Sequence, residues 1–196
     1  MSIPKPGNMK IITTVIFIVF SALAYGQLPV QNFTLNNVDG GPVSLDSYTS
    51  VAGIAVIFTG NECAFDNYYT DRIKLFIEMF SGKIQFLLIN SYVEPGESAD
   101  KMAAKYKRWG FTVPYLIDKD QTAMNILGAK KSPEVFLLKN TGGKFMIVYQ
   151  GALDDNPQMA SDVKQTFLKT SIDKLLAGQK IDVPVMRAVG CSIRKK

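Results

Sequence analysis

The chain has 196 residues, enough for one domain of ordinary size with a buried core. Hydrophobic residues make up 47% of it and charged residues 20%, which indicates a globular protein and excludes an intrinsically disordered one. Its formal net charge is +5, and it contains two cysteines and no histidine. The absence of histidine excludes Ser-His-Asp and Cys-His catalysis and the usual zinc sites.

Residues 1–26 are typical of a secretory signal peptide, and Met9 is an alternative start. Lys10 precedes the apolar run "IITTVIFIVFSALA", and Ala24 and Gly26 place small residues at the −3 and −1 positions of a cleavage site. The run is short for a membrane span, and cleavage would leave Gln27 first instead of a lipid-bearing cysteine. We therefore expect a secreted or periplasmic protein without a stable membrane anchor.

The first half of the mature chain predicts a hairpin followed by a strand, a helix and a second strand. Residues 31–48 alternate apolar and polar side chains around Asp39-Gly40-Gly41, as hairpins do. The apolar runs 51–58 and 83–90 are typical of strands buried on both faces. Between them, apolar residues recur at spacings of three and four over 65–80, which predicts an amphipathic helix.

The second half continues this alternation and adds a tail. In chain order we expect a helix from about Ser98 that ends at Gly110, a short strand within 111–120, a helix over 121–129, a hairpin of 132–140 with 142–153, a helix over 159–178 and the tail 179–196. Strands alternating with helices predict a parallel core with helices on both faces, and the late hairpin makes the sheet mixed. No linker divides the chain, so residues 27–196, tail included, are predicted to form one domain.

Cys63 lies in "FTGNECAF", where a predicted strand meets a predicted helix. A helix N-terminus offers free N–H groups and a positive dipole end, and both favour a thiolate. Glu62 and Asp66 oppose this by raising the cost of a further negative charge. No cation is close in sequence, and Arg72 is expected to face solvent. The plainer interpretation of Cys63 is a small, partly buried residue at a strand–helix corner.

Cys191 lies in the tail, within "VGCSIRKK". It is either a free thiol or the partner of Cys63, which lies 128 residues upstream (191 − 63). Closing so long a loop would stabilise the fold by roughly 5 kcal/mol in the chain-entropy description. Three basic residues follow Cys191 and favour its thiolate, so a Cys63–Cys191 disulfide is either a structural staple or a redox couple.

The order of these elements, together with four local motifs, resembles the thioredoxin-like redoxins, a group that includes peroxiredoxins. "FTLNNVDGGPVSLDSY" resembles their N-terminal hairpin, and "FTGNECAF" occupies the place of their active-site loop. "KSPEVFLL" with "GGKFMIVYQGALDD" resembles the cis-proline strand and the following hairpin. The tail "VPVMRAVGCSIRKK" resembles a peroxiredoxin-like branch that ends in Gly-Cys-Ser-Ile and basic residues.

The resemblance implies a fold and a set of site residues. The fold is α/β and thioredoxin-like, with a central mixed β-sheet flanked by helices and an N-terminal hairpin. Cys63 and Cys191 are the implied catalytic residues, and Ser132–Pro133, the latter cis and facing Cys63, forms a substrate-binding loop with Thr59 and Gly60. In that branch the active-site loop usually carries two cysteines, and here Gly60 replaces the first.

Three functions follow as expectations. The first is extracytoplasmic thiol-disulfide exchange or reduction through Cys63, with Cys191 as resolving partner and a thiol- or disulfide-bearing protein or small molecule as substrate. The second is a thioredoxin-fold binding module in which Gly60 ended catalysis. The third is a thiol peroxidase, although Thr59 lies four residues before Cys63 instead of the three of the peroxiredoxin loop. No metal, cofactor or nucleic-acid partner is expected, and Asp154-Asp155 is expected to form a turn.

Overall fold

The computed structural model describes Met1 and residues 28–196, so the predicted signal peptide and its cleavage site fall, apart from Met1, outside the described residues. The strands are β1 (Thr34–Asn37), β2 (Gly40–Ser44), β3 (Gly53–Phe58), β4 (Ile84–Asn90), β5 (Tyr115–Ile117), β6 (Lys131–Ser132), β7 (Glu134–Thr141), β8 (Lys144–Gly151), β9 (Val185–Met186) and β10 (Cys191–Ser192). The helices are α1 (Ala64–Met79), α2 (Ala99–Trp109), α3 (Thr122–Leu127) and α4 (Phe167–Leu176), with short 3-10 turns η1 (Leu45–Tyr48), η2 (Pro95–Glu97) and η3 (Ala160–Asp162).

A mixed sheet of eight strands forms the centre, in the order β2-β1-β5-β4-β3-β7-β8-β9. Strands β3, β4 and β5 are parallel, and β7 and β8 add an antiparallel hairpin beside β3. The N-terminal hairpin of β1 and β2 joins the opposite side through β5. The predicted sheet class and both hairpins are confirmed.

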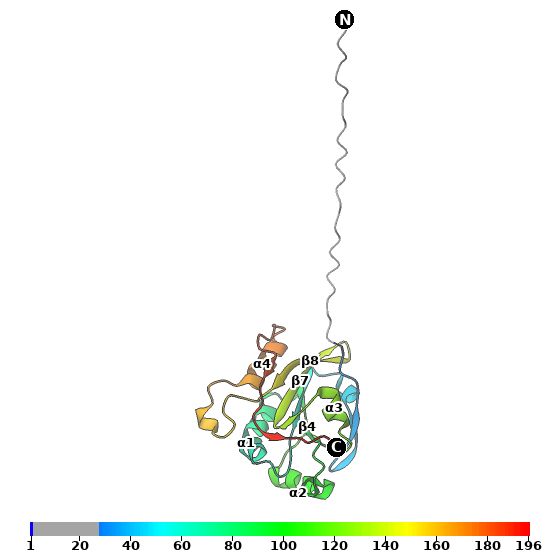
Figure 1. Cartoon of the computed structure of the whole chain (residues 1–196), viewed down its shortest axis with the longest axis vertical. Helices are drawn as coiled ribbons and strands as arrows, with labels where there is room; N and C mark the ends of the chain where they lie inside the picture. Colours follow the sequence, from blue (N-terminus) through cyan, green and yellow to red (C-terminus); the bar gives the residue numbers. More distant parts are fainter. Residues whose placement is uncertain (2–27) are drawn as a thin grey trace.

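Apolar side chains cover both faces of this sheet. Alternate residues of β3 point to opposite faces, so Ala55 and Ile57 join one cluster with α1, α2 and α4, whereas Ile54, Val56 and Phe58 join another with α3. Figure 1 shows α1 and α4 on one side of the strands and α3 on the other. All six residues of β3 are buried for this reason, which explains the continuous apolar run.

The end of the chain differs from the expectation. The helix predicted over 159–178 is formed only over Phe167–Leu176, because the preceding backbone makes other bonds: Asp155 N donates to Gln165 O, and Lys164 N donates to Asp155 Oδ1. The tail also forms two strands, β9 and β10, that are too short for a period to reveal them. Among residues 28–196, no helix combines the length and apolarity needed to cross a membrane.

Candidate active site

Cys63 is the N-cap of α1, at the point where the chain leaves β3 and the loop 59–62 and enters the helix. Its backbone is extended, and its side chain is buried, with 5% exposed. The sulfur therefore sits at the positive end of a 16-residue helix.

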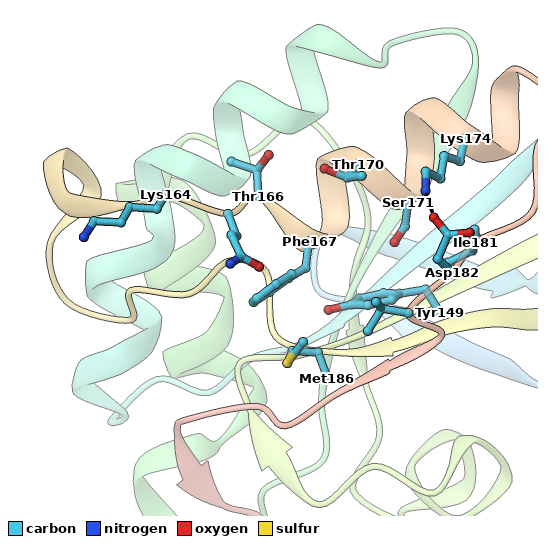
Figure 2. A pocket seen from close by; sticks show the side chains of 12 residues that line it. Tyr149, Lys164, Thr166, Phe167, Thr170, Ser171, Lys174, Ile181, Asp182 and Met186 are labelled. Atoms are coloured by element: carbon cyan, nitrogen blue, oxygen red, sulfur yellow. Dashed lines mark hydrogen bonds and ion pairs between the residues drawn. The ribbon is translucent and has the colours of Figure 1, made fainter.

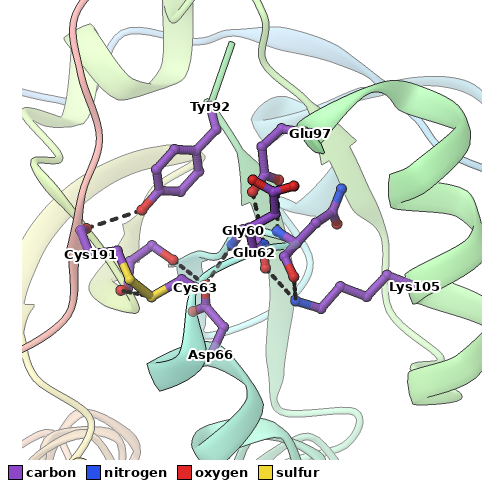
Figure 3. Close-up of a disulfide and its surroundings, with 10 residues drawn as sticks. Gly60, Glu62, Cys63, Asp66, Tyr92, Glu97, Lys105 and Cys191 are labelled. Atoms are coloured by element: carbon purple, nitrogen blue, oxygen red, sulfur yellow. Dashed lines mark hydrogen bonds between the residues drawn. A yellow bond between two sulfur atoms is a disulfide. The ribbon is translucent and has the colours of Figure 1, made fainter. Parts of the chain in front are cut away.

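A disulfide joins Cys63 to Cys191, with the two Cα atoms 5.9 Å apart (Figure 3). The tail brings Cys191 there as part of β10, which pairs antiparallel with β6 so that Cys191 lies opposite Ser132. Cys63 is buried whereas Cys191 is half-buried, so the bond is approached from the tail side. Of the alternatives for Cys191, the structure has the disulfide and not the free thiol.

Ser132–Pro133 is a cis peptide and lies beside this disulfide, as the resemblance implied. The Ser132 carbonyl oxygen is 3.3 Å from Cys63 Sγ. The Ser132 side chain is fully buried and its hydroxyl donates a hydrogen bond to Asp66 Oδ2. Thr59 is also buried, at 1% exposed, and its backbone N–H donates to Ile89 O. Neither side chain is therefore exposed, and the Ser132 backbone is paired with Cys191 of the tail.

Buried charged side chains hold the loop that precedes Cys63. Lys105, from α2, is 2% exposed, and its Nζ donates to Gly60 O at 2.5 Å and Asn61 O at 2.7 Å. Glu97, from η2, accepts from Asn61 N at 2.7 Å and Glu62 N at 3.0 Å. Burial lowers the pKa of Lys105 to about 8, and the negative charges of Asp66 and Glu97 oppose that shift. Both groups fix the backbone of the loop, not the cysteine itself.

Asp66 is a buried carboxyl one turn into α1, directly below the disulfide (Figure 3). Its Oδ2 accepts from Gly60 N at 2.7 Å and from the Ser132 hydroxyl, and its Oδ1 finds no hydrogen-bond partner among the described residues. Burial raises the pKa of Asp66 to about 7, although these hydrogen bonds and the charge of Lys105 lower it. A carboxyl of this kind can take up or release a proton near neutral pH.

Tyr92 follows β4 and connects the loop to the tail. Its hydroxyl donates to Cys191 O at 3.1 Å. Burial raises the pKa of Tyr92, so the hydroxyl remains a donor at neutral pH. The ring lies against Gly60, where an added Cβ would be 2.7 Å from Tyr92 Cε2. Tyr92 therefore fills the space that a side chain at position 60 would need.

A cavity of about 290 Å³ opens onto the disulfide. Three glutamates, one arginine, both cysteines, Tyr92 and Ser192 line it: Glu62, Cys63, Tyr92, Glu94, Glu97, Cys191, Ser192 and Arg194. A second cavity of about 340 Å³ lies between α4, β8 and the segment 181–186, with Tyr149, Phe167 and Met186 among its walls (Figure 2). The two share no lining residue, and only the first contains cysteines.

Sequence reasoning missed Lys105, Glu97 and Tyr92. Lys105 left one signal: it falls in the stripe of α2 between the buried residues Met102 and Trp109, where an apolar residue is expected. Arg72 was placed wrongly in solvent. Its NH1 contacts Asp154 Oδ2 at 2.6 Å, and the Arg72 side chain is 11% exposed. Asp154 is thus a buried ion-pair partner, and no group of three or more potential metal ligands occurs among the described residues.

Comparison with known proteins identifies the fold. A hypothetical protein of Sinorhizobium meliloti is 25% identical, with a TM-score of 0.77 over 87% of this chain and 94% of its own. An uncharacterized conserved protein of Geobacillus kaustophilus is 27% identical, with a TM-score of 0.78 over 87% and 92%. The pneumococcal exposed lipoprotein thioredoxin of Streptococcus pneumoniae matches at 19% identity and a TM-score of 0.56, over 73% of this chain and 99% of its own. The chain has the thioredoxin-like fold.

No protein-family model matches the sequence, and no curated protein matches it either. Within the thioredoxin-like fold, this chain carries its disulfide between the loop after β3 and its own tail, at Cys63 and Cys191.

Proposed function

We propose that this chain is an extracytoplasmic thiol-disulfide oxidoreductase that reduces or exchanges disulfides of thiol-bearing substrates. Cys63 is the attacking thiol and Cys191 the resolving one. The observation that carries the proposal is the disulfide between a buried cysteine at a helix N-terminus and a half-buried cysteine on the tail, next to an open cavity. A helix N-terminus stabilises the thiolate that must attack.

The surrounding groups support the same role. The Ser132 carbonyl beside Cys63 Sγ would accept a hydrogen bond from the reduced, protonated thiol, which positions the sulfur but, unlike the helix N-terminus, does not favour its thiolate. Asp66, whose Oδ1 has no hydrogen-bond partner among the described residues, supplies a group able to exchange a proton near neutral pH. The basic residues after Cys191 favour Cys191 as a thiolate, which suits a resolving or leaving sulfur.

The location belongs to the same proposal. A structural or redox disulfide persists in an oxidising compartment, and the predicted signal peptide would deliver residues 27–196 to one. We propose that these residues, including the tail 179–196, act as one redoxin domain. Thr59, Gly60, Ser132 and Pro133 are buried and do not line the cavity while the tail is in place. We propose that they contact the substrate when the tail leaves, Ser132 through its backbone.

A redox titration of the full mature chain tests the proposal. The protein is equilibrated in dithiothreitol or glutathione buffers of known potential, quenched with acid, alkylated and weighed by mass spectrometry. An exchange catalyst should show a midpoint between about −120 and −270 mV, the range of known thiol oxidoreductases, whereas a structural staple should lie below about −300 mV. A midpoint in the staple range overturns the proposal.

The second candidate is a binding module, and the position of Tyr92 favours it. Because the Tyr92 ring occupies the space beside Gly60, the loop has no room for the second cysteine of a dithiol loop. A chain that resists reduction in the titration and yet binds peptide would be of this kind. Consumption of peroxide by the reduced chain, followed in the same samples, would instead support the thiol peroxidase.

A further inference from the structure

The tail runs along β6 as an added strand. Strand β6 pairs only with β10 among the described residues, with Cys191 opposite Ser132 and Ser192 opposite Lys131. The pairing continues one residue further, because Ile193 N donates to Lys130 O at 2.9 Å. Glu134 holds the other side of this segment by accepting from the N–H groups of Lys130 and Lys131. The edge is thus held in place independently of the tail.

Two further side chains form hydrogen bonds to the backbone of the tail. Tyr92 donates to Cys191 O, and Gln121 donates to Arg194 O at 2.7 Å and accepts from Lys196 N at 2.8 Å. Gln121 is 2% exposed, and it is the one non-glycine residue with a positive φ, 57°, in the described part of the chain. A polar side chain held buried on a strained backbone is a feature that folds retain at binding sites. Because these contacts go to backbone atoms only, they do not depend on which side chains the tail carries.

Selectivity comes from two tail positions on either side of the sulfur. At Gly190 an added Cβ would overlap the Ser132 carbonyl and lie 3.0 Å from Pro133 N, so only glycine fits. Ile193 is 7% exposed and packs into the apolar cluster around α3. Ser192, between them, is exposed, so the edge places no requirement on the side chain at this position. The pattern that fits this edge is therefore Gly-Cys-x-aliphatic.

We propose that the edge 130–132, with Tyr92, Gln121 and Cys63, is a binding site for extended protein segments of the pattern Gly-Cys-x-aliphatic, and that the tail is its intramolecular occupant. The inference rests on the proposed function and names its substrate class. Strand addition supplies backbone hydrogen bonds, and pockets for alternate side chains supply specificity.

The exchange balances with the chain's own two thiols. In the reduced chain the Cys63 thiolate attacks the cysteine sulfur of a docked segment that is in disulfide linkage. A Cys63–segment S–S bond forms, the old S–S bond breaks, and the other substrate sulfur leaves as a thiolate with the electron pair. The Cys191 thiolate then attacks Cys63 Sγ, so the Cys63–Cys191 bond forms and the segment leaves reduced. Two electrons pass from the chain to the substrate, and the tail regains the edge.

The test uses the full mature chain with Cys191→Ser, so that Cys63 is free and the tail is not covalently held. Its substrate is the blocked hexapeptide Val-Gly-Cys-Ser-Ile-Arg, whose cysteine carries 2-nitro-5-thiobenzoate, and the released chromophore gives the rate. Matched peptides replace the glycine by alanine or the isoleucine by aspartate. We expect saturation with the parent peptide and a second-order rate about tenfold above either matched peptide.

Two protein variants sharpen the result. Adding Gly190→Ala to Cys191→Ser weakens the tail's hold on the edge and should raise the rate with the parent peptide several-fold. Adding Gln121→Ala to the Cys191→Ser, Gly190→Ala chain, in which the tail competes only weakly for the edge, removes the donor to the arginine carbonyl of the docked peptide and should lower the rate. The exposed Gln179→Ala in the same background is the matched control and should leave the rate unchanged.

As a control for the reactivity of Cys63, the chain is also treated with the symmetric disulfide of 2-nitro-5-thiobenzoate, which carries no peptide. If this reagent reacts with Cys63 and all three peptides react at equal rates without saturation, the proposed binding site is overturned. If neither peptides nor reagent react, the proposed function falls as well. A dimer linked by Cys63–Cys191 bonds between two chains, seen by gel filtration and non-reducing electrophoresis of the wild type, would identify a second copy as the occupant and also overturn the proposal.

Discussion

Gly60 and Tyr92 are packed so closely that the absence of a side chain at position 60 is a steric requirement of this site. A Cβ built on Gly60 lies 2.7 Å from Cε2 and 2.9 Å from Cδ2 of the Tyr92 ring, and 3.2 Å from Glu97 Oε1. Gly60 has no positive φ, so its backbone would accept another residue. A cysteine at this position thus needs Tyr92 to move, and Tyr92 is tied to Cys191.

Gly60→Ala should therefore lower the free energy of unfolding by about 1–3 kcal/mol, the usual effect of overpacking a buried site. The same change in a Tyr92→Ala background should be much less destabilising, because the ring that it overlaps is gone. Tyr92→Phe keeps the ring and is the matched control background. Guanidinium unfolding of the oxidised variants measures all three effects, and an equal loss in the Tyr92→Ala background would contradict the steric account.

The disulfide should account for a large part of the stability of the oxidised protein. It closes a loop with a sequence separation of 128 residues. We expect Cys191→Ser to lower the free energy of unfolding by up to about 5 kcal/mol, because the unfolded chain regains the freedom that the loop removes. Adding dithiothreitol should lower the stability of the wild type to that of the variant.

Dithiothreitol should have no effect on Cys191→Ser itself, which makes this variant the control for non-specific effects of the reductant. A wild type whose guanidinium midpoint does not change on verified reduction would show that the tail is held without the disulfide.

The sequence was most informative where local pattern and packing agree. The helix predicted over 65–80 is formed over Ala64–Met79, because its apolar spacing is the face that packs on the sheet. The closing helix was predicted too long, since residues 159–166 have no such constraint and are instead fixed by hydrogen bonds to Asp155 and by η3. Hydrogen bonds between segments distant from a helix produce no periodic pattern of apolar residues, so the sequence does not reveal them.

The candidate site was predictable in its sulfur chemistry and not in its charges. Cys63, Ser132–Pro133 and Cys191 could be placed by their motifs, and the structure brings them together. Lys105 lies 44 residues along the chain from Asn61, and Glu97 lies 35 residues from Glu62. Both side chains hydrogen-bond to the backbone of the loop that contains Asn61 and Glu62. Charged residues are seldom buried, so composition favours solvent for both, and only the assembled fold shows otherwise.

Lys105→Met should destabilise the protein by about 3 kcal/mol or more, because two loop carbonyls lose their donor and the buried carboxyls lose their counter-charge. It should also raise the pKa of Asp66 further, since the charge of Lys105 lowers it in the wild type. Carbon NMR titration of the Asp66 carboxyl measures this shift. Lys101→Met, exposed on the same helix, is the matched control, and an unchanged Asp66 titration in Lys105→Met would refute the coupling.

Asp66→Asn should change how stability depends on pH. Burial raises the folded-state pKa of Asp66 to about 7 from its ordinary value of 3.8. Between these values the folded state binds a proton that the unfolded state has lost, so the contribution of Asp66 to stability falls as pH rises from about 4 to 7. Below about 4 both states are protonated, and above about 7 both are ionised and the penalty is complete.

Asparagine cannot ionise, yet its oxygen can still accept from Gly60 N and the Ser132 hydroxyl. Relative to the wild type, Asp66→Asn should therefore gain stability as pH rises from 4 to 7, by roughly 1.4 kcal/mol per pH unit, and hold that gain above pH 7. Guanidinium unfolding of the oxidised proteins at pH 4.5, 6 and 8 measures the difference. Asp71→Asn, with a side chain that is 98% exposed on the same helix, is the control. A difference that is constant across these pH values would mean that Asp66 is already ionised at acidic pH in the folded protein, and its assignment as the proton-exchanging group near Cys63 would fall.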